Sequence, residues 1–406
     1  MAILPLHPRT TLCAGTCADP VGAGPSPDRS CLVIGLRQHM RGIGSSKSRW
    51  WRAGASVVAA ILGTATAVAV SGSAIGAPSG PAIIASGLQG PLGLAVASNG
   101  TIYVSESNAG TVDAIATDGS KRTIAATAGG LSTGGVDVSR AGTVAYTVAS
   151  GEGAAKPVGL VNLTRANGTV ATLADFASYE KRKNPDGKQR YGFLDLTASC
   201  AALVPPEIGG HPHGGDVNSN PYAVLSMRDG SWFVADAGGN DVLKVNRHGR
   251  ISLVAVLPAS KVVVTRAISG ALGLPACTIG KTYAFDPVPT DVELGPHGML
   301  YVSSLPGGPE DASLGARGAV YTISRRHGHA KLLARGFLGA TDLAVGYDGT
   351  VYVTELFGNK VSKIRHGRIS TVRELNQPAA VELSKGTLYV STDVFGPDGK
   401  VVSFKP

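Results

Sequence analysis

The stretch PLGLAVASNGTIYVSESNAGTVDAIATDGSKRTIA, residues 91–125, contains one complete structural repeat. It consists of four short apolar segments, two tight turns and one longer loop between the second and third segments. The tight turns fall at Asn99-Gly100 and Asp118-Gly119. Asn, Asp and Gly tolerate the positive φ angles that hairpin turns require. The stretch therefore predicts four antiparallel strands.

Two further copies of this repeat are clear, PYAVLSMRDGSWFVADAGGNDVLKVNRHGRISLVAVL at 221–257 and ATDLAVGYDGTVYVTELFGNKVSKIRHGRISTVREL at 340–375. The two turn glycines are 19, 19 and 18 residues apart in the three copies. Three degenerate copies begin near residues 134, 289 and 378. Short strands and turns at such regular intervals are typical of a β-propeller. We therefore expect an all-β fold, a six-bladed β-propeller with four-stranded blades.

The last repeat ends after three strands, at Pro406. The missing strand can come from PAIIASGL, residues 81–88, which directly precedes the first full copy. Pairing of the two ends of the chain would leave no open sheet edge. We therefore expect a ring that is closed by an N-terminal strand.

Composition and charge narrow the class of protein. The 406 residues include 55 Gly and 24 Pro, which suits many short strands joined by turns. Residues 1–77 hold seven of the 37 basic residues and two of the 28 acidic ones, which leaves 30 basic against 26 acidic residues elsewhere. This small excess does not favour a nucleic-acid partner.

The N-terminal part has the order of an export signal. After Met40 come four basic residues, an apolar run over 53–70 and small residues up to Ala77. We predict a signal peptide at 40–77 and a secreted propeller domain at 78–406, with a retained membrane anchor as the alternative. No membrane association is expected after cleavage. Residues 1–39 are interpreted as a non-native or disordered extension.

The cysteines follow from this division. Cys13, Cys17 and Cys31 precede the signal, so the exported chain keeps Cys200 and Cys277. Two cysteines in an oxidising compartment predict a disulfide. Two independent thiols are the alternative.

Long insertions gather on one face of the predicted disc. They occupy residues 151–157, 174–219, 257–288 and 305–317, whereas every turn on the opposite face is minimal. Loops on a rigid scaffold commonly carry function, so we place the binding face here. The alternative is that long loops are merely tolerated.

Several polar side chains on this face are candidate ligand contacts. The ends of the second strands supply Glu106, Asp236 and Glu355 in one column, and the starts of the first strands supply Asp291 and Asp342. Carboxylates around a propeller channel could hold Ca²⁺ or another divalent cation. The column of strand-two acids has a structural alternative, in which each accepts backbone N–H groups of its own loop. Tyr222 is the remaining candidate contact.

A second possible metal site lies in HPHGGDVNSN, where His211, His213 and Asp216 fall within six residues. Spacing alone does not make a metal site, and a polar glycine-rich loop is the alternative. The candidate metal ligands are thus Asp291, Asp342, His211, His213 and Asp216. The chain contains no sequence motif for a catalytic nucleophile, so no catalytic residue is assigned.

Five segments resemble the ScyD/ScyE family of exported propellers. They are NPDG (184–187), SNPY (219–222), VADAGGND (234–241), the stretch 287–321 and TDLAVGYDGTVYV (341–353). The resemblance implies a six-bladed propeller and no established catalytic activity. More distantly the repeat is similar to NHL and SMP-30/gluconolactonase-like propellers, whose enzymes hold a divalent cation with Glu, Asn and Asp. That ligand set does not match this sequence residue by residue.

Two functions remain open at this point. In the first, the protein is a monomeric ligand-binding or scaffolding propeller that captures a small molecule, glycan or protein on the loop-rich face. In the second, it is a metal-dependent hydrolase, lactonase or lyase with a divalent cation at the channel mouth. The absence of a catalytic motif favours the first.

Overall fold

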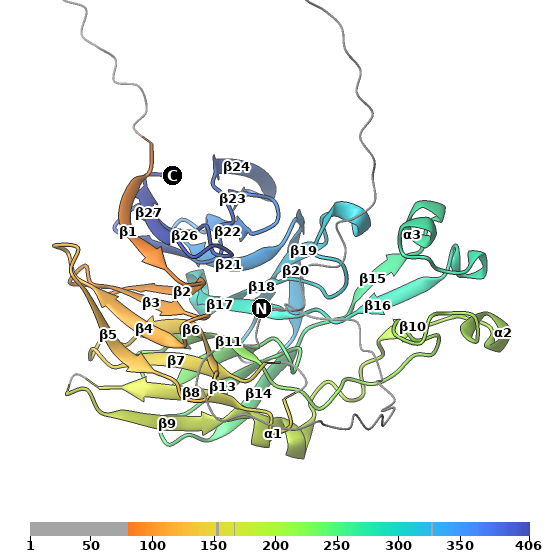
Figure 1. Cartoon of the computed structure of the whole chain (residues 1–406), viewed down its shortest axis with the longest axis horizontal. Coiled ribbons are helices and arrows are strands. Elements are labelled where there is room, and N and C mark those ends of the chain that lie inside the picture. The colour runs from red at the N-terminus through yellow and green to blue at the C-terminus, as the bar shows by residue number, and fades with distance from the viewer. Residues whose placement is uncertain (1–79, 152–153, 166, 326–327) are drawn as a thin grey trace, which may run out of the picture. The chain divides into compact units, whose positions relative to one another are not determined.

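The structure is a computed structural model that describes residues 80–406, except 152–153, 166 and 326–327. The predicted extension, the signal peptide and the first three cysteines lie outside the described residues. Within them the chain is mostly β, with six four-stranded antiparallel sheets and one three-stranded sheet (Figure 1). This agrees with the predicted all-β class and with the predicted four-stranded antiparallel sheets.

Each four-stranded sheet follows one repeat of the sequence. The first three sheets comprise β2 (Pro91–Val96), β3 (Ile102–Glu106), β4 (Thr111–Ile115) and β5 (Lys121–Ala126); β6 (Ser132–Val138), β7 (Val144–Ala149), β8 (Gly159–Thr164) and β9 (Val170–Asp175); and β11 (Pro221–Ser226), β12 (Trp232–Asp236), β13 (Asp241–Val245) and β14 (Ile251–Val256). The next two comprise β17 (Pro289–Leu294), β18 (Leu300–Ser304), β19 (Gly318–Ile323) and β20 (Ala330–Phe337); and β21 (Ala340–Val345), β22 (Val351–Glu355), β23 (Lys360–Arg365) and β24 (Arg368–Glu374).

The sixth sheet combines the two ends of the described chain. It comprises β25 (Val381–Ser384), β26 (Thr387–Thr392), β27 (Gly399–Phe404) and β1 (Ala82–Leu88). Strand β1 pairs antiparallel with β27, from Ala82 opposite Ser403 to Leu88 opposite Gly399. Residues 82–88 thus supply the fourth strand that the last repeat lacks.

Tight turns produce the hairpins, and burial between sheets produces the core. Gly100 and Gly119 have φ angles of 92° and 84°, which favour glycine at these turns. The apolar side chains on both sides of the inner strands are buried, as Val234 and Val302 illustrate with 0% exposure. One core cluster joins the sheet that contains β11 to the sheet that contains β17, so the hydrophobic core lies between neighbouring sheets.

The first strands of successive sheets lie next to one another, in the order β2, β6, β11, β17, β21 and β25, and β25 is again next to β2. Side-chain hydroxyls fix some of these contacts. Thr290 donates to the Ala340 carbonyl over 3.0 Å, and Thr341 donates to the Ala379 carbonyl over 2.9 Å. The starts of these strands therefore surround a common axis.

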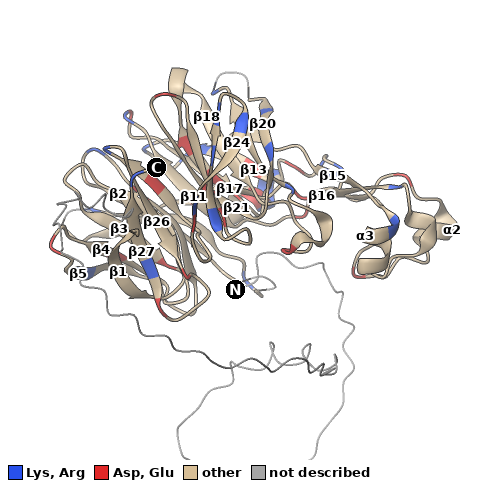
Figure 2. Ribbon diagram, turned by 90° about the horizontal axis from the view of Figure 1, so that it is seen from above, with Lys and Arg blue, Asp and Glu red and all other residues tan. Residues whose placement is uncertain are grey.

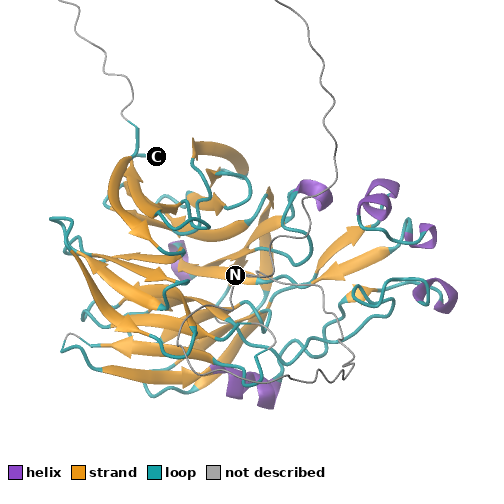
Figure 3. Ribbon diagram, in the orientation of Figure 1, coloured by secondary structure: helices purple, strands orange, loops and turns teal. Residues whose placement is uncertain are grey.

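The two largest insertions contain helices and short strands in addition to loops (Figure 3). They carry α1 (Phe176–Lys183), α2 (Ala198–Ala201), α3 (Arg266–Ala271) and a small sheet of β10 (Gly192–Phe193), β16 (Thr282–Phe285) and β15 (Ser260–Val263). Short 3₁₀ turns lie at η1 (Ala276–Thr278), η2 (Pro296–Gly298) and η3 (Ala312–Leu314). Figure 2 shows β15, β16, α2 and α3 projecting beyond the four-stranded sheets.

The structure pairs Cys200 with Cys277 in a disulfide, with the Cα atoms 5.9 Å apart, as predicted. The bond joins the two insertions, and its two cysteines lie 77 residues apart in the chain. Among the described residues, no helix has both the length and the apolar character that a membrane span needs.

Candidate functional site

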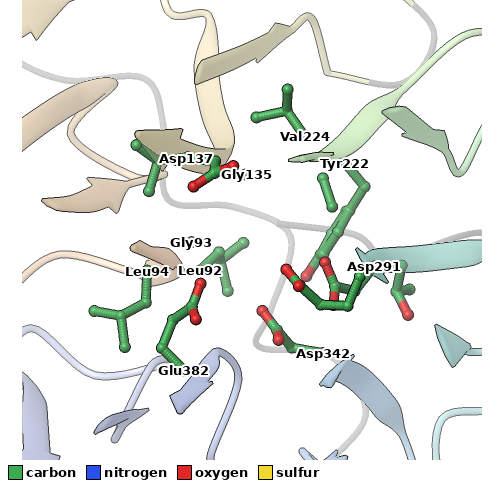
Figure 4. Close-up of a pocket in the computed structure, with 14 residues that line it drawn as sticks. Leu92, Gly93, Leu94, Gly135, Asp137, Tyr222, Val224, Asp291, Asp342 and Glu382 are labelled. Atoms are coloured by element: carbon green, nitrogen blue, oxygen red, sulfur yellow. The ribbon is translucent and has the colours of Figure 1, made fainter. Parts of the chain in front are cut away.

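A pocket lies on the axis, between the first strands of the sheets (Figure 4). Five carboxylates line it, from four different strands: Asp137 of β6, Asp291 and Glu293 of β17, Asp342 of β21 and Glu382 of β25. The lining contains no Lys, Arg or His. The pocket is therefore strongly acidic.

The repeat explains why these side chains face the axis. Asp291 and Asp342 are the third residues of their strands. Glu293 is the fifth residue of β17, and Glu382 occupies the equivalent position of the last repeat. Side chains two residues apart in a strand point to the same side. Small residues occupy the third position in other repeats, including Gly93 and Gly135. The carboxylates thus form two layers along the pocket.

Three of the aspartates also join adjacent sheets. Asp291 Oδ2 accepts the Leu343 N–H over 3.2 Å. Asp137 Oδ2 accepts the Ser226 N–H over 2.5 Å, and Asp342 has a backbone hydrogen bond with Val381. Each bond runs from a first strand to the next first strand. These aspartates therefore have a structural role besides any role in binding.

Burial disfavours ionisation of this set. It raises the pKa of Asp291 to about 7. Burial, with repulsion from neighbouring carboxylates, raises the pKa of Glu293, Asp342 and Glu382 well above their usual range. Since no basic side chain lines the pocket, a bound cation would stabilise the ionised forms.

Tyr222 reaches the same pocket from β11. Its side chain is 9% exposed, and its hydroxyl has no hydrogen-bond partner. Burial raises its pKa, and the nearby Asp342 and Asp291 raise it further. The space open to water in the pocket is only about 20 Å³. That is room for roughly one water molecule or ion, so an organic ligand would have to lie at the mouth.

The strand-two acids do not line this pocket. Glu106 Oε2 accepts the Gln89 N–H over 2.6 Å, and Glu355 Oε2 accepts the Leu338 N–H over 2.8 Å. Asp236 Oδ1 accepts the N–H groups of Asn220, Gly238 and Gly239. These three carboxylates therefore accept backbone N–H groups, which is the structural alternative predicted from the sequence. Most of these N–H groups belong to the loop that leads into the sheet. Ligand binding by these three residues stays a prediction.

The other predicted metal ligands lie away from the axis. His211, His213 and Asp216 are exposed and belong to the insertion between β9 and β11. The Nδ1 atom of His213 lies 2.8 Å from the carbonyl oxygen of Gly214, and the backbone of His213 pairs with that of Tyr191. Across the described part of the chain, no three His, Cys, Asp or Glu side chains are already set to hold a metal ion. The structure therefore does not bring this group together with Asp291 and Asp342.

Sequence reasoning missed three of the five axial carboxylates: Asp137, Glu293 and Glu382. A signal for them was present. Each lies two residues after the repeat position that holds Asp291, so strand alternation places it on the same side.

A second cavity lies in the disulfide-linked insertions. Its volume is about 220 Å³, and apolar side chains dominate the lining. They include Val262, Leu272, Leu274 and Phe285. A cavity of this size and character suits a small apolar ligand.

No family model matches the chain, and no curated protein matches it. Solved structures do. A protein of unknown function from Bacteroides thetaiotaomicron is 13% identical with a TM-score of 0.50, covering 78% of this chain and 70% of its own. A gluconolactonase from Xanthomonas campestris is 13% identical with a TM-score of 0.46, and the match covers 77% of this chain and 86% of the gluconolactonase.

An inactive variant of virginiamycin B lyase from Staphylococcus aureus, solved with quinupristin, is 15% identical with a TM-score of 0.43 and coverages of 74% and 77%. The gluconolactonase-like and virginiamycin B lyase-like neighbours are propeller proteins. Identities of 13–15% show the fold alone.

Proposed function

We propose that this protein is an exported six-bladed propeller, closed by β1, whose axial pocket binds a divalent cation and acts with it as a hydrolase or lyase. The observation that carries the proposal is the convergence of five carboxylates and one unpartnered tyrosine hydroxyl on a pocket without a basic residue. The sheet order and the pairing of β1 with β27 support the ring. The resemblance to the ScyD/ScyE family and the disulfide support export.

The donor set suits a hard cation. Carboxylate oxygens are the ligands that Ca²⁺ and Mg²⁺ prefer. Asp291, Asp342 and Glu382 would hold the ion, because Figure 4 shows their carboxyl groups directed toward the pocket centre. When bound, such a cation polarises a carbonyl group or lowers the pKa of water.

The chain itself supplies the remaining functions of such a site. The backbone hydrogen bonds of Asp291 and Asp342 hold these carboxylates in place before any ligand arrives. The hydroxyl of Tyr222 is buried without a hydrogen-bond partner and would donate to a ligand oxygen inside the pocket. The narrow pocket excludes anything larger than water or an ion, so the reacting group of a substrate would lie at its opening.

A non-catalytic binding protein is the second candidate. The apolar cavity of about 220 Å³ favours it, because this cavity has the size and lining of a small-ligand site but no acidic group for chemistry except Glu207. In that case the insertions bind the ligand, and the axial carboxylates only join the sheets.

Metal content and turnover distinguish these functions. We expect Asp342→Asn to lose one bound divalent cation per chain by elemental analysis and at least ten-fold in turnover on a panel of lactones and aryl esters. The control Glu374→Gln, at an exposed site on β24, should change neither. Unchanged metal content and turnover in Asp342→Asn would overturn the proposal. A wild-type protein that holds no cation at the axial pocket and turns over no substrate would favour the binding protein.

A further inference from the structure

A second acidic group lies outside the axial pocket, at the corner where β12 ends and β13 begins. Asp236 closes β12 and Asp241 opens β13, and the two residues are directly opposite in the strand register. Their exposures are 1% and 0%. Glu180 of helix α1 is 1% exposed and interacts electrostatically with Asp236. We call these three residues the acidic corner.

Like charges directly opposite in a sheet are destabilising. The Cβ position of an alanine at residue 239 would lie 3.4 Å from Glu180 Oε2, 3.5 Å from Asp236 Cγ and 3.5 Å from Asp241 Oδ1. All three carboxyl groups therefore surround one small space beside Gly239. They are not at metal-ligand spacing already, as expected for like charges with nothing between them.

The protein satisfies only one of the three carboxylates. Asp236 accepts four hydrogen bonds, from the Ser219 hydroxyl and from three backbone N–H groups. Both carboxylate oxygens of Glu180 and both of Asp241 are buried without a hydrogen-bond partner. A buried polar group without a partner destabilises the folded state, and a charged group does so more strongly. These four oxygens are therefore available as ligands for a cation.

Protein cations do not fill this role. None of the ion pairs in the described part of the chain involves Glu180, Asp236 or Asp241. The basic side chains nearest to Glu180 in sequence, Lys181 and Arg182, are exposed. The corner thus combines three buried carboxylates with no positive charge in contact.

We propose that a divalent cation of the calcium type binds at the acidic corner, held by the carboxylates of Glu180 and Asp241. Oxygen ligands and flexible geometry suit Ca²⁺ better than a transition metal. Asp186 lies close enough to interact with both carboxylates, and its Oδ1 is also unpartnered. The cation would bind α1 and the start of the first large insertion to the sheet. This site is independent of the axial pocket.

Thermal unfolding of the full chain in CaCl₂ and in chelator tests the proposal. We expect calcium at about 100 times its dissociation constant to raise the melting temperature by roughly 5 °C. In the axial variant Asp342→Asn, which lacks the other proposed cation site, adding Glu180→Gln or Asp241→Asn should abolish this shift. In chelator both should melt at or above the temperature of Asp342→Asn alone, because each removes a buried carboxyl group without a hydrogen-bond partner. A purely structural carboxylate would instead lower the melting temperature under both conditions.

A second variant keeps every carboxylate. Gly239→Ala places a methyl group in the space between them at ordinary contact distances, so it should fold but bind Tb³⁺ at least ten-fold more weakly by sensitised luminescence. Gly270→Ala adds a methyl group to open space and serves as the control. The axial variant Asp342→Asn should keep the calcium shift of the corner. No calcium shift in Asp342→Asn, or equal shifts in Asp342→Asn with and without Asp241→Asn, would overturn the proposal.

Discussion

The acidic corner and the corner between β22 and β23 occupy the same place in two repeats, yet they balance charge differently. Glu355 ends β22 and faces Lys360, whose Nζ lies 3.5 Å from Glu355 Oε1. Asp236 ends β12 and faces Asp241. One position thus holds a lysine in one repeat and an aspartate in the other. The repeat fixes the acid that organises the corner, whereas the counter-charge can come from a side chain or, as we propose, from a bound ion.

The largest effect is expected at Asp236. Asp236→Ala leaves four donors without their acceptor in a site that is 1% exposed, so it should lower the free energy of unfolding by about 3–5 kcal/mol. Glu355→Ala should cost less, because Glu355 accepts from the Leu338 N–H and the Ser362 hydroxyl.

Denaturant unfolding followed by tryptophan fluorescence measures both losses, since Trp232 is buried in β12. The loss at Asp236 should be similar with calcium and with chelator, because protein donors hold this carboxylate. Equal losses in the two variants would mean that the corners are built alike, contrary to the comparison.

The sequence predicted these corners as far as the repeat extends. The x-Gly turns located the hairpins, and the recurrence of Glu106, Asp236 and Glu355 indicated acceptors of backbone N–H groups, as the hydrogen bonds show. The proximity of Glu180 to Asp241 could not be predicted, because α1 belongs to an insertion without a repeat. Its position depends on how that segment packs on the sheet.

The axial pocket was partly predictable. Asp291 and Asp342 were singled out because other repeats lack them, and they do line the pocket. Glu293 and Glu382 were overlooked, although strand alternation places them on the same side. The sequence could not show that Asp291 and Asp342 also join adjacent sheets, since those bonds depend on the stagger of neighbouring strands.

An intermediate effect is expected when the lysine corner is made acidic. Lys360→Asp removes the counter-charge of Glu355, which is 2% exposed, and places a like charge opposite. We expect a loss of about 1–3 kcal/mol in the free energy of unfolding. Calcium should not restore it, because Glu180 and α1 belong to the other corner.

The measurement is denaturant unfolding of Lys360→Asp with and without calcium. Lys331→Asp, at an exposed site on β20, provides the control for the change in net charge. If calcium restored the full stability, two opposed acidic residues would suffice for a cation site. Glu180 would then be dispensable at the acidic corner.

The smallest effect concerns a third corner, between β3 and β4, where a lysine again supplies the charge. Lys121 Nζ lies 3.0 Å from both Glu106 Oε1 and Asp113 Oδ2. Burial lowers the pKa of Lys121, but hydrogen bonds to Asp113 and Glu106 outweigh this and raise it above its usual 10.5. The ammonium therefore contributes stability below pH 10.5, and this contribution disappears as the pH rises through the raised pKa.

The Lys121 side chain is 40% exposed, so we expect Lys121→Met to melt only about 1–2 °C below wild type at pH 8. The gap should close when the pH exceeds the raised pKa of Lys121, whereas the exposed control Lys331→Met should show no gap at either pH. Because a lysine corner depends on its proton and the acidic corner on its cation, alkali should weaken the first and chelator the second. A gap that persists unchanged at high pH would show that Lys121 acts through its methylene groups, not through its charge.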